Sequence, residues 1–305
     1  MHVVLLGSAA GGGFPQWNCW CPGCRTARHN PSLAHPRTQS SAAVSADGSR
    51  WFLLNASPDV RDQLRWLASL DAPSTLRHVP LEGVVVTDAE IDHTLGIVLL
   101  REAGRLPVYA TPAVQSILEE DARLLPMTRA FSDVPVVSLH LDVPNGAVPL
   151  CYRDGTSSGL TVEAFAVPAG PPRFATHDEA GHTVGLVVRD AAGAMCAFVP
   201  GCGGLEPALL DRLARADALL FDGTFWTDDE LVVMGISSRT ARQMDHLPIA
   251  GPGGSLEQLA RLPCRHRIYT HINNTNPILL EQSPERMAVA DAGISVGFDG
   301  LRLTL

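Results

Sequence analysis

The amino-acid sequence predicts a single α/β domain, spanning residues 1–305, with two packed β-sheets and helices outside them. Two observations support this prediction. Strand-length apolar runs form two successive groups along the chain, and helix-like segments are interleaved with both groups. The regular strand–helix alternation that is typical of a parallel doubly wound sheet is missing, and no repeat, linker or low-complexity tract divides the chain.

The first group of predicted strands lies in the N-terminal half of the chain. Ser57 and Thr111 are each followed by a proline, which is the typical start of a helix, and the apolar run 95–100 predicts a further helix. A turn at Asp47-Gly48 joins two of the strands. The strands predicted in this half are residues 2–7, 41–47, 51–54, 84–86 and 107–110.

The second group of predicted strands follows the same logic. A helix is predicted over about residues 207–216, and a last helix begins with Ser283 as its N-cap and ends at Gly293. Glycine and alanine at 191–193 predict a hairpin between two of the strands. The strands predicted here are residues 134–140, 160–167, 184–189, 194–199, 218–221, 267–270 and 301–305.

Composition and charge exclude several classes of protein. The chain has 305 residues, of which 46% are hydrophobic and 18% charged, as in an ordinary globular domain. A net charge of −9 argues against a nucleic-acid partner, because no basic patch is available to displace counterions. No apolar stretch reaches membrane-spanning length, and the N-terminal run 1–7 lacks the basic residues of a signal peptide, so we expect a cytoplasmic protein.

A glycine-rich loop with three cysteines follows the first predicted strand. The glycines of residues 7–13 match neither a P-loop nor a dinucleotide motif, and they predict a loop that approaches another group closely. Cys19, Cys21 and Cys24 are close enough to chelate one tetrahedral Zn²⁺. A redox CxxC is the alternative, but the extra Cys19 and the lack of a following βαβ pattern favour a structural zinc.

Potential ligands of a second metal are concentrated after the β-branched run 84–86. Asp88, Glu90, Asp92 and His93 lie within six positions between a predicted strand and a predicted helix, a rigid support for a site. The alternative is that these acids only cap and charge the start of the helix. His271 also follows a predicted strand, and the loop 243–248 carries His246. Cys202 lies between glycines, but the spacing differs from that of a nucleophile elbow.

Several of these segments resemble a known family. Asp88-x-Glu90-x-Asp92-His93 resembles the His-x-His-x-Asp-His loop of the metallo-β-lactamase superfamily, with both leading histidines replaced. The more specific resemblance is to the family of coenzyme PQQ synthesis protein B, PqqB, within that superfamily. It implies an αββα sandwich and a role in making pyrroloquinoline quinone, PQQ, from a Glu and a Tyr of a small peptide. The segments that carry it are residues 7–19, 55–59, 87–93 and 271–277.

The resemblance also implies which metal ligands this chain lacks. The third histidine of the superfamily's first metal site would fall near Ala169 and the bridging aspartate near Gly201, and neither residue can bind metal. The residues that remain, Asp92, His93 and His271, form the 2-His-1-carboxylate set associated with non-haem Fe(II) oxygenases, with three positions open for O₂ and substrate.

Further residues receive roles through the same resemblance. Asp222 either orients a ligand of the active-site metal or is a fourth ligand, and the fourth position of the cysteine site falls near Asn274, where Asn274, another residue or a water completes the zinc. Asp88, Glu90 and His246 are assigned to the substrate, with Asp88 and Glu90 alternatively supporting the ligands from behind.

Three functions follow from this interpretation. The first is iron-dependent hydroxylation of the tyrosine ring of a Glu–Tyr precursor of PQQ, as a small molecule or short peptide. The second is a non-catalytic carrier that assists transport of PQQ or its precursor to the periplasm. The third is a mononuclear metallohydrolase. The sequence leaves the oligomeric state open, a homodimer included.

Overall fold

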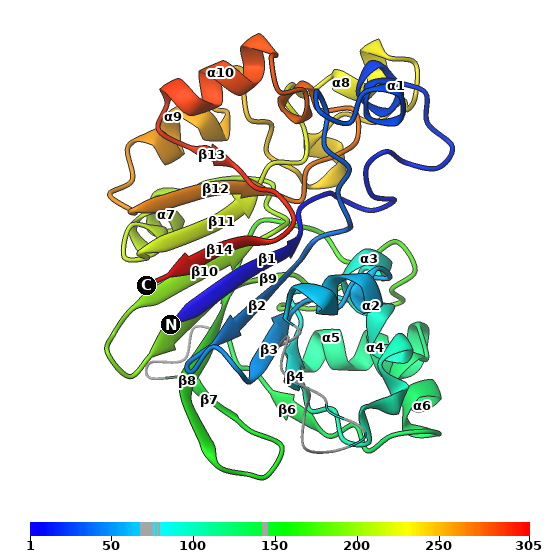
Figure 1. The fold of residues 1–305 in the computed structure, drawn as a ribbon, viewed down its shortest axis with the longest axis vertical. Helices are drawn as coiled ribbons and strands as arrows, with labels where there is room; N and C mark the ends of the chain where they lie inside the picture. Colours follow the sequence, from blue (N-terminus) through cyan, green and yellow to red (C-terminus); the bar gives the residue numbers. More distant parts are fainter. Residues whose placement is uncertain (68–75, 77, 79, 142–145) are drawn as a thin grey trace.

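Two seven-stranded β-sheets lie face to face in the computed structural model, which describes residues 1–67, 76, 78, 80–141 and 146–305 (Figure 1). The first sheet has the order β14-β1-β2-β3-β4-β5-β6. The N-terminal and C-terminal strands pair antiparallel within it. Its strands are β1 (His2–Gly7), β2 (Ser41–Ser45), β3 (Trp51–Leu54), β4 (Leu81–Val85), β5 (Val108–Ala110), β6 (Val136–Ser138) and β14 (Leu301–Thr304).

The second sheet has the order β13-β12-β11-β10-β9-β8-β7. Neighbours from β7 to β10 pair antiparallel, and neighbours from β10 to β13 pair parallel. Its strands are β7 (Val148–Cys151), β8 (Ser157–Ala166), β9 (Val184–Asp190), β10 (Met195–Val199), β11 (Ala218–Asp222), β12 (His266–Thr270) and β13 (Ser295–Val296).

Short helices cover the outer face of each sheet. Those on the first sheet are α2 (Val60–Gln63), η1 (Leu64–Trp66), α3 (Ile91–Thr94), α4 (Gly96–Leu99), η2 (Arg101–Ala103), α5 (Pro112–Ser116), η3 (Ile117–Asp121) and α6 (Leu124–Arg129). Those on the second sheet or the loops beside it are α1 (Pro22–His29), α7 (Pro207–Leu213), α8 (Glu230–Val233), η4 (Arg242–Met244), α9 (Ser255–Ala260), η5 (Pro277–Leu279) and α10 (Pro284–Asp291). Within the described residues, none of these helices is long and apolar enough to cross a membrane.

The alternation of side chains along β1 shows why four layers form. Val3 and Leu5 point into the core between the two sheets, where they meet residues of the second sheet such as Phe198. Val4 and Leu6 point the other way, into the core under the helices of the first sheet. Because successive strand residues face opposite sides, a strand that is apolar at every position must be covered on both faces. This arrangement confirms the predicted αββα sandwich.

Most predicted elements are present, with two kinds of difference. Ser57 is not an N-cap as predicted: its hydroxyl donates to Gln63 Oε1, and helix α2 begins later, with Asp59 at the N-cap position. The helix after β4 begins at Ile91, so Asp92 and His93 lie in its first turn. The sequence analysis missed several short elements, which are mostly one turn long or at a sheet edge and carry little periodicity: α1, α6, α8, α9, β7 and β13.

Candidate metal centre

The predicted ligands meet at the carboxyl ends of strands from both sheets. Asp88 lies just after β4, Asp222 is the last residue of β11, and His271 directly follows β12. Asp88 and His271 line a cavity of about 510 Å³, a size that accommodates a small molecule, and Asp222 is buried behind the cavity wall. Strand ends bring together residues that are distant in sequence, because neighbouring strands of a parallel sheet end at the same edge.

Asp92, His93 and His271 form one of two carboxylate–imidazole groups among the described residues, and Asp222, His246 and His271 form the other. One ligand atom from each lies within 4.8 Å of the others. His271 Nε2 lies 3.3 Å from Asp92 Oδ2, and His93 Nε2 lies 3.8 Å from the same oxygen. These three atoms could hold one cation, with the cavity on its open side.

His93 is oriented from behind by a buried carboxylate. Its Nδ1 lies 2.8 Å from both oxygens of Asp88, which also accepts hydrogen bonds from the Thr87 hydroxyl and the Glu90 backbone N–H. When the His93 Nδ1–H donates a hydrogen bond to Asp88 and the ring is neutral, the lone pair of the ring lies on Nε2. That nitrogen is buried and has no hydrogen-bond partner among the described residues. An unpartnered Nε2 facing a carboxylate is what a metal ligand looks like in the absence of its ion.

His271 is oriented by Thr224, a residue that the sequence analysis missed. The Thr224 hydroxyl lies 2.5 Å from Asp222 Oδ1 and 2.8 Å from His271 Nδ1. The Thr224 hydroxyl donates its single hydrogen to the Asp222 carboxylate, because the charged acceptor gives the stronger hydrogen bond. The His271 Nδ1–H then donates to the hydroxyl oxygen, and His271 Nε2 is left free to bind a metal. His271 also has a left-handed backbone, with φ of 53°. Such a conformation is uncommon for a non-glycine residue and is often found at functional sites.

Asp222 holds a third imidazole. Its Oδ2 accepts from His246 Nδ1 at 2.7 Å and from the Cys202 backbone N–H, while Oδ1 accepts from Thr224. Asp222 is fully buried, and both of its oxygens are occupied. Of the two roles that the sequence left open for Asp222, this geometry favours orienting a ligand. The His246 ring stacks on His271 with centroids 5.4 Å apart, and both line the cavity.

The charges of the centre suit a cation. Burial alone would lower the pKa of His93, but the carboxylates of Asp88 and Asp92 outweigh it and raise that pKa to about 9. Burial likewise opposes the ionisation of Asp92, yet His93 and a hydrogen bond from His271 hold its pKa below the ordinary range. Burial and two neighbouring carboxylates raise the pKa of Glu90 to about 7. A positive charge is therefore favoured between these carboxylates, where a metal would replace the proton.

The glycine-rich loop after β1 closes one side of the centre. A Cβ on Gly11 would lie 3.2 Å from Asp92 Oδ2, so a glycine is needed for this close approach. The loop is held by backbone pairing of Ala9 with Gln39 and with Ile272. The prediction of close approach named no partner, and the structure identifies the partner as Asp92.

Ala169 and Gly201, which the resemblance equates with two ligands of the superfamily, both line the cavity, as do Asp88 and Glu90. Neither Ala169 nor Gly201 carries a side-chain donor atom, so neither residue can bind a metal of the superfamily's first site. Glu90 is half-buried at the start of α3, with its carboxylate at the cavity.

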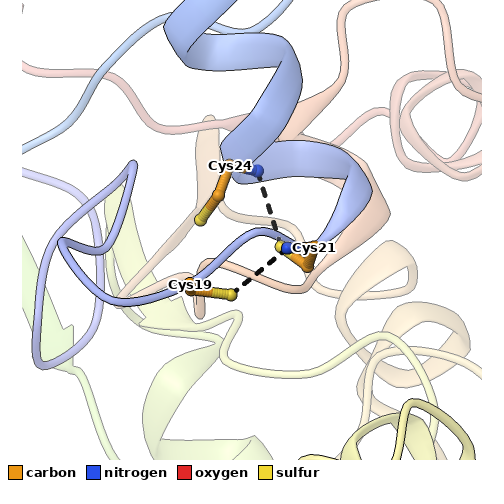
Figure 2. Close-up of side chains that lie close together, drawn as sticks. All are labelled: Cys19, Cys21 and Cys24. Carbon is orange, nitrogen blue, oxygen red and sulfur yellow. Dashed lines mark hydrogen bonds between the residues drawn. The ribbon is translucent and has the colours of Figure 1, made fainter.

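The three cysteines form a separate cluster at the start of α1. Figure 2 shows their side chains converging: the Cys21 N–H donates to Cys19 Sγ, and the Cys24 N–H donates to Cys21 Sγ, which caps the helix. The three sulfur atoms lie within 4.8 Å of one another. The Asn274 side-chain amide lies beside the cluster, and its N–H donates to Cys24 Sγ over 3.3 Å. Three thiols this close suit a tetrahedral Zn²⁺ with a fourth ligand, and Asn274 as that ligand stays a prediction, because its amide nitrogen acts here as a hydrogen-bond donor.

Comparisons with known proteins agree with these features. Residues 50–272 match the Beta-lactamase superfamily domain. Coenzyme PQQ synthesis protein B of Gluconacetobacter diazotrophicus is 42% identical over 100% of this chain and 99% of its own, and that of Methylobacterium nodulans is 44% identical over the full length of both.

Solved structures give the same result. The zinc-bound PqqB of Methylobacterium extorquens is 40% identical and superposes with a TM-score of 0.89 over all of both chains. A diphosphatase of the PhnP family, at 20% identity and a TM-score of 0.68 over 100% of this chain and 97% of its own, shares the fold. The identities of 40–44% to the three PqqB proteins, each over the whole chain, show the family: the chain belongs to the coenzyme PQQ synthesis protein B family of the metallo-β-lactamase superfamily.

Proposed function

We propose that this protein is an iron-dependent hydroxylase that acts on the tyrosine ring of a Glu–Tyr precursor of PQQ. The observation that carries the proposal is the group of Asp92, His93 and His271, in which the Nε2 atoms of both histidines face one carboxylate oxygen. A facial set of two histidines and one carboxylate is the ligand set of non-haem Fe(II) oxygenases. Membership of a PQQ-synthesis family supports the pathway.

The proposed hydroxylation consumes one O₂ and two electrons for each ring that is hydroxylated. Iron bound by these three residues would supply the activation of O₂. One ring C–H becomes C–OH, the second oxygen atom leaves as water, and two electrons and two protons come from an external two-electron reductant such as ascorbate. The product is a catechol.

The residues behind the ligands fix their direction. Asp88 holds His93 through Nδ1, and Thr224 with Asp222 holds His271 in the same way. Such partners set the tautomer and the ring angle of a ligating histidine. Glu90 and His246 line the cavity and are placed to meet the substrate. With a pKa near 7, Glu90 can accept or donate a proton at neutral pH.

The other two functions have less support. A dinuclear hydrolase needs a second metal and a bridging carboxylate, and Ala169 and Gly201 occupy those places in the cavity wall. A carrier would need the cavity but not the oriented imidazoles. We also propose a structural Zn²⁺ at Cys19, Cys21 and Cys24, with the zinc of the M. extorquens relative as support that the family binds this metal.

The test is turnover by anaerobically Fe²⁺-loaded protein. Oxygen uptake and catechol formation are followed on tyrosine-containing substrates with ascorbate present, alongside metal content by elemental analysis. His93→Ala and His271→Ala should abolish both signals while circular dichroism stays unchanged. His140→Ala, an exposed histidine at the end of β6, is the matched control and should behave like the parent protein.

Each alternative has its own outcome. Normal hydroxylation by both alanine variants would refute the proposal. Tight PQQ binding without any oxygen uptake would indicate a carrier, and oxygen-independent cleavage with Zn²⁺ or Mn²⁺ would indicate a hydrolase.

A further inference from the structure

Two arginines stand on the loops that meet over the cavity. Arg173 follows the proline-rich loop after β8, and Arg239 precedes η4, and both line the cavity. The two loops touch: a Cβ on Gly170 would lie 2.9 Å from the carboxylate of Asp245. These two loops form the rim of the cavity and each carries one arginine, although 66 positions separate the residues in sequence (239 − 173).

Neither arginine is neutralised by an ion pair within the described part of the chain. The Arg239 guanidinium donates to the backbone carbonyl of Gln243, which holds it in place and leaves other donors unused. Arg173 is exposed, and its charge is felt by Glu90, whose pKa it lowers against the larger effects of burial and of Asp88. A guanidinium that lines a cavity and has no carboxylate partner among the described residues suits a carboxylate or phosphate ligand.

The rest of the cavity narrows the ligand class. Four acidic residues line the cavity. Asp88 and Asp92 each contact a histidine, and the other two are Glu90 and the exposed Asp245. Beside the histidines lies the aromatic ring of Phe225, edge-on to His246 with centroids 5.9 Å apart, and Met244 adds apolar surface. The interior suits an aromatic ring next to the metal ligands, and the rim suits negative groups that point outward.

We propose that Arg173 and Arg239 bind carboxylates of the substrate, so that the site takes an aromatic polycarboxylate rather than a lone tyrosine. This inference rests on the proposed function. A molecule made by joining a free Glu to a free Tyr carries three carboxylates, two from Glu and one from Tyr. The two arginines then orient the ring toward Asp92, His93 and His271 by holding the opposite end of the molecule.

The experiment measures binding, independently of turnover. Zinc-loaded protein is titrated with PQQ, an aromatic tricarboxylate, and with its trimethyl ester, by calorimetry without oxygen or iron. The parent protein should bind PQQ at least about tenfold more tightly than the ester, and the preference should shrink with added salt. Arg173→Gln and Arg239→Gln should each weaken PQQ binding by about tenfold and leave ester binding unchanged.

The control is Arg261→Gln, an exposed arginine at the end of α9, which should bind like the parent. Equal affinity for PQQ in the parent and both rim variants would overturn the inference, as would equal affinity for acid and ester. Arginine-dependent PQQ binding together with no Fe²⁺-dependent hydroxylation would refute the hydroxylase and keep the carboxylate site. Fe²⁺-dependent hydroxylation together with PQQ binding that does not depend on the two arginines would refute the carboxylate site and keep the hydroxylase.

Discussion

The cysteine cluster and the Asp/His centre differ in how much of the chain builds them. Cys19, Cys21 and Cys24 come from one short segment, and their sulfurs converge around the first turn of one helix. Asp92 and His271 are 179 residues apart: Asp92 lies in helix α3, after β4 of the first sheet, and His271 follows β12 of the second sheet. The first site lies at the start of α1 beside Asn274, whereas the second is held by elements of both sheets and opens on a cavity.

Because the two sites are built differently, we expect the removal of a metal ligand to lower stability at the cysteine cluster and to lower activity or affinity at the Asp/His centre. A metal that ties a loop contributes to folding, so its loss lowers stability. A metal held by prebuilt strands contributes to chemistry, so its loss lowers turnover or affinity and leaves the fold.

Cys21→Ser should release zinc and lower the melting temperature by roughly 10 °C, because about 3 kcal/mol of the zinc contribution would be lost at about 2–4 °C per kcal/mol. Thermal unfolding with and without a chelator is the measurement. Cys151→Ser, a half-buried cysteine outside the cluster, should be unaffected. Equal melting temperatures of the parent with and without chelator would show that no zinc stabilises this loop.

Thr224→Val should weaken binding of the active-site metal by about 10–100-fold, because it removes the hydroxyl that orients His271. Metal affinity is measured by competition with a chelating dye. Thr270→Val is the matched control: Thr270 is also buried and next to His271, but its hydroxyl has no hydrogen-bond partner among the described residues. The prediction fails if both valine variants bind metal alike.

The ionisation of Glu230, which lies beside Thr275 near the cysteine cluster, should make the free energy of unfolding depend on pH. Burial raises the pKa of Glu230 to about 7, although Thr275 and the Trp226 N–H donate to it. A carboxyl whose folded pKa exceeds its unfolded value, about 4.3, stabilises the fold most below that value. Stability should therefore fall as pH rises from about 4.3 to 7, by up to about 4 kcal/mol, since one pKa unit is about 1.4 kcal/mol.

Glu230→Gln should remove this decline, which urea unfolding at several pH values would measure. A variant whose stability falls over the same window as the parent's would assign the decline to other groups.

Gly11→Ala should have the smallest effect, a loss of metal affinity of a few-fold, because the new methyl group displaces Asp92 by a few tenths of an ångström. Gly201→Ala is the control in the same cavity wall, since a Cβ there meets no atom within 4 Å. Unchanged affinity in the Gly11 variant would show that the loop yields instead of Asp92.

Much of the fold follows from local pattern. The apolar strands and the caps at Thr111 and Ser283 are where the sequence predicts them, because a hydroxyl before a proline starts a helix wherever the backbone N–H groups are free. The cap at Ser57 was predicted wrongly, because its hydroxyl donates to the side chain of Gln63 at the far end of the same helix, which begins at Val60. Short edge strands such as β7 were missed, since their pairing depends on a neighbour rather than on their own residues.

The ligand types and their local spacing can be read from the amino-acid sequence: three thiols around one turn, and Asp92 and His93 after a buried strand. The distant groups that meet these ligands become known only from the folded protein. Thr224 behind His271, Asp222 behind His246, Gly11 against Asp92, and the two rim arginines all depend on contacts between loops. The physical reason is that spacing along one helix or strand is set by backbone geometry, whereas contacts between strand ends are set by the packing of the two sheets.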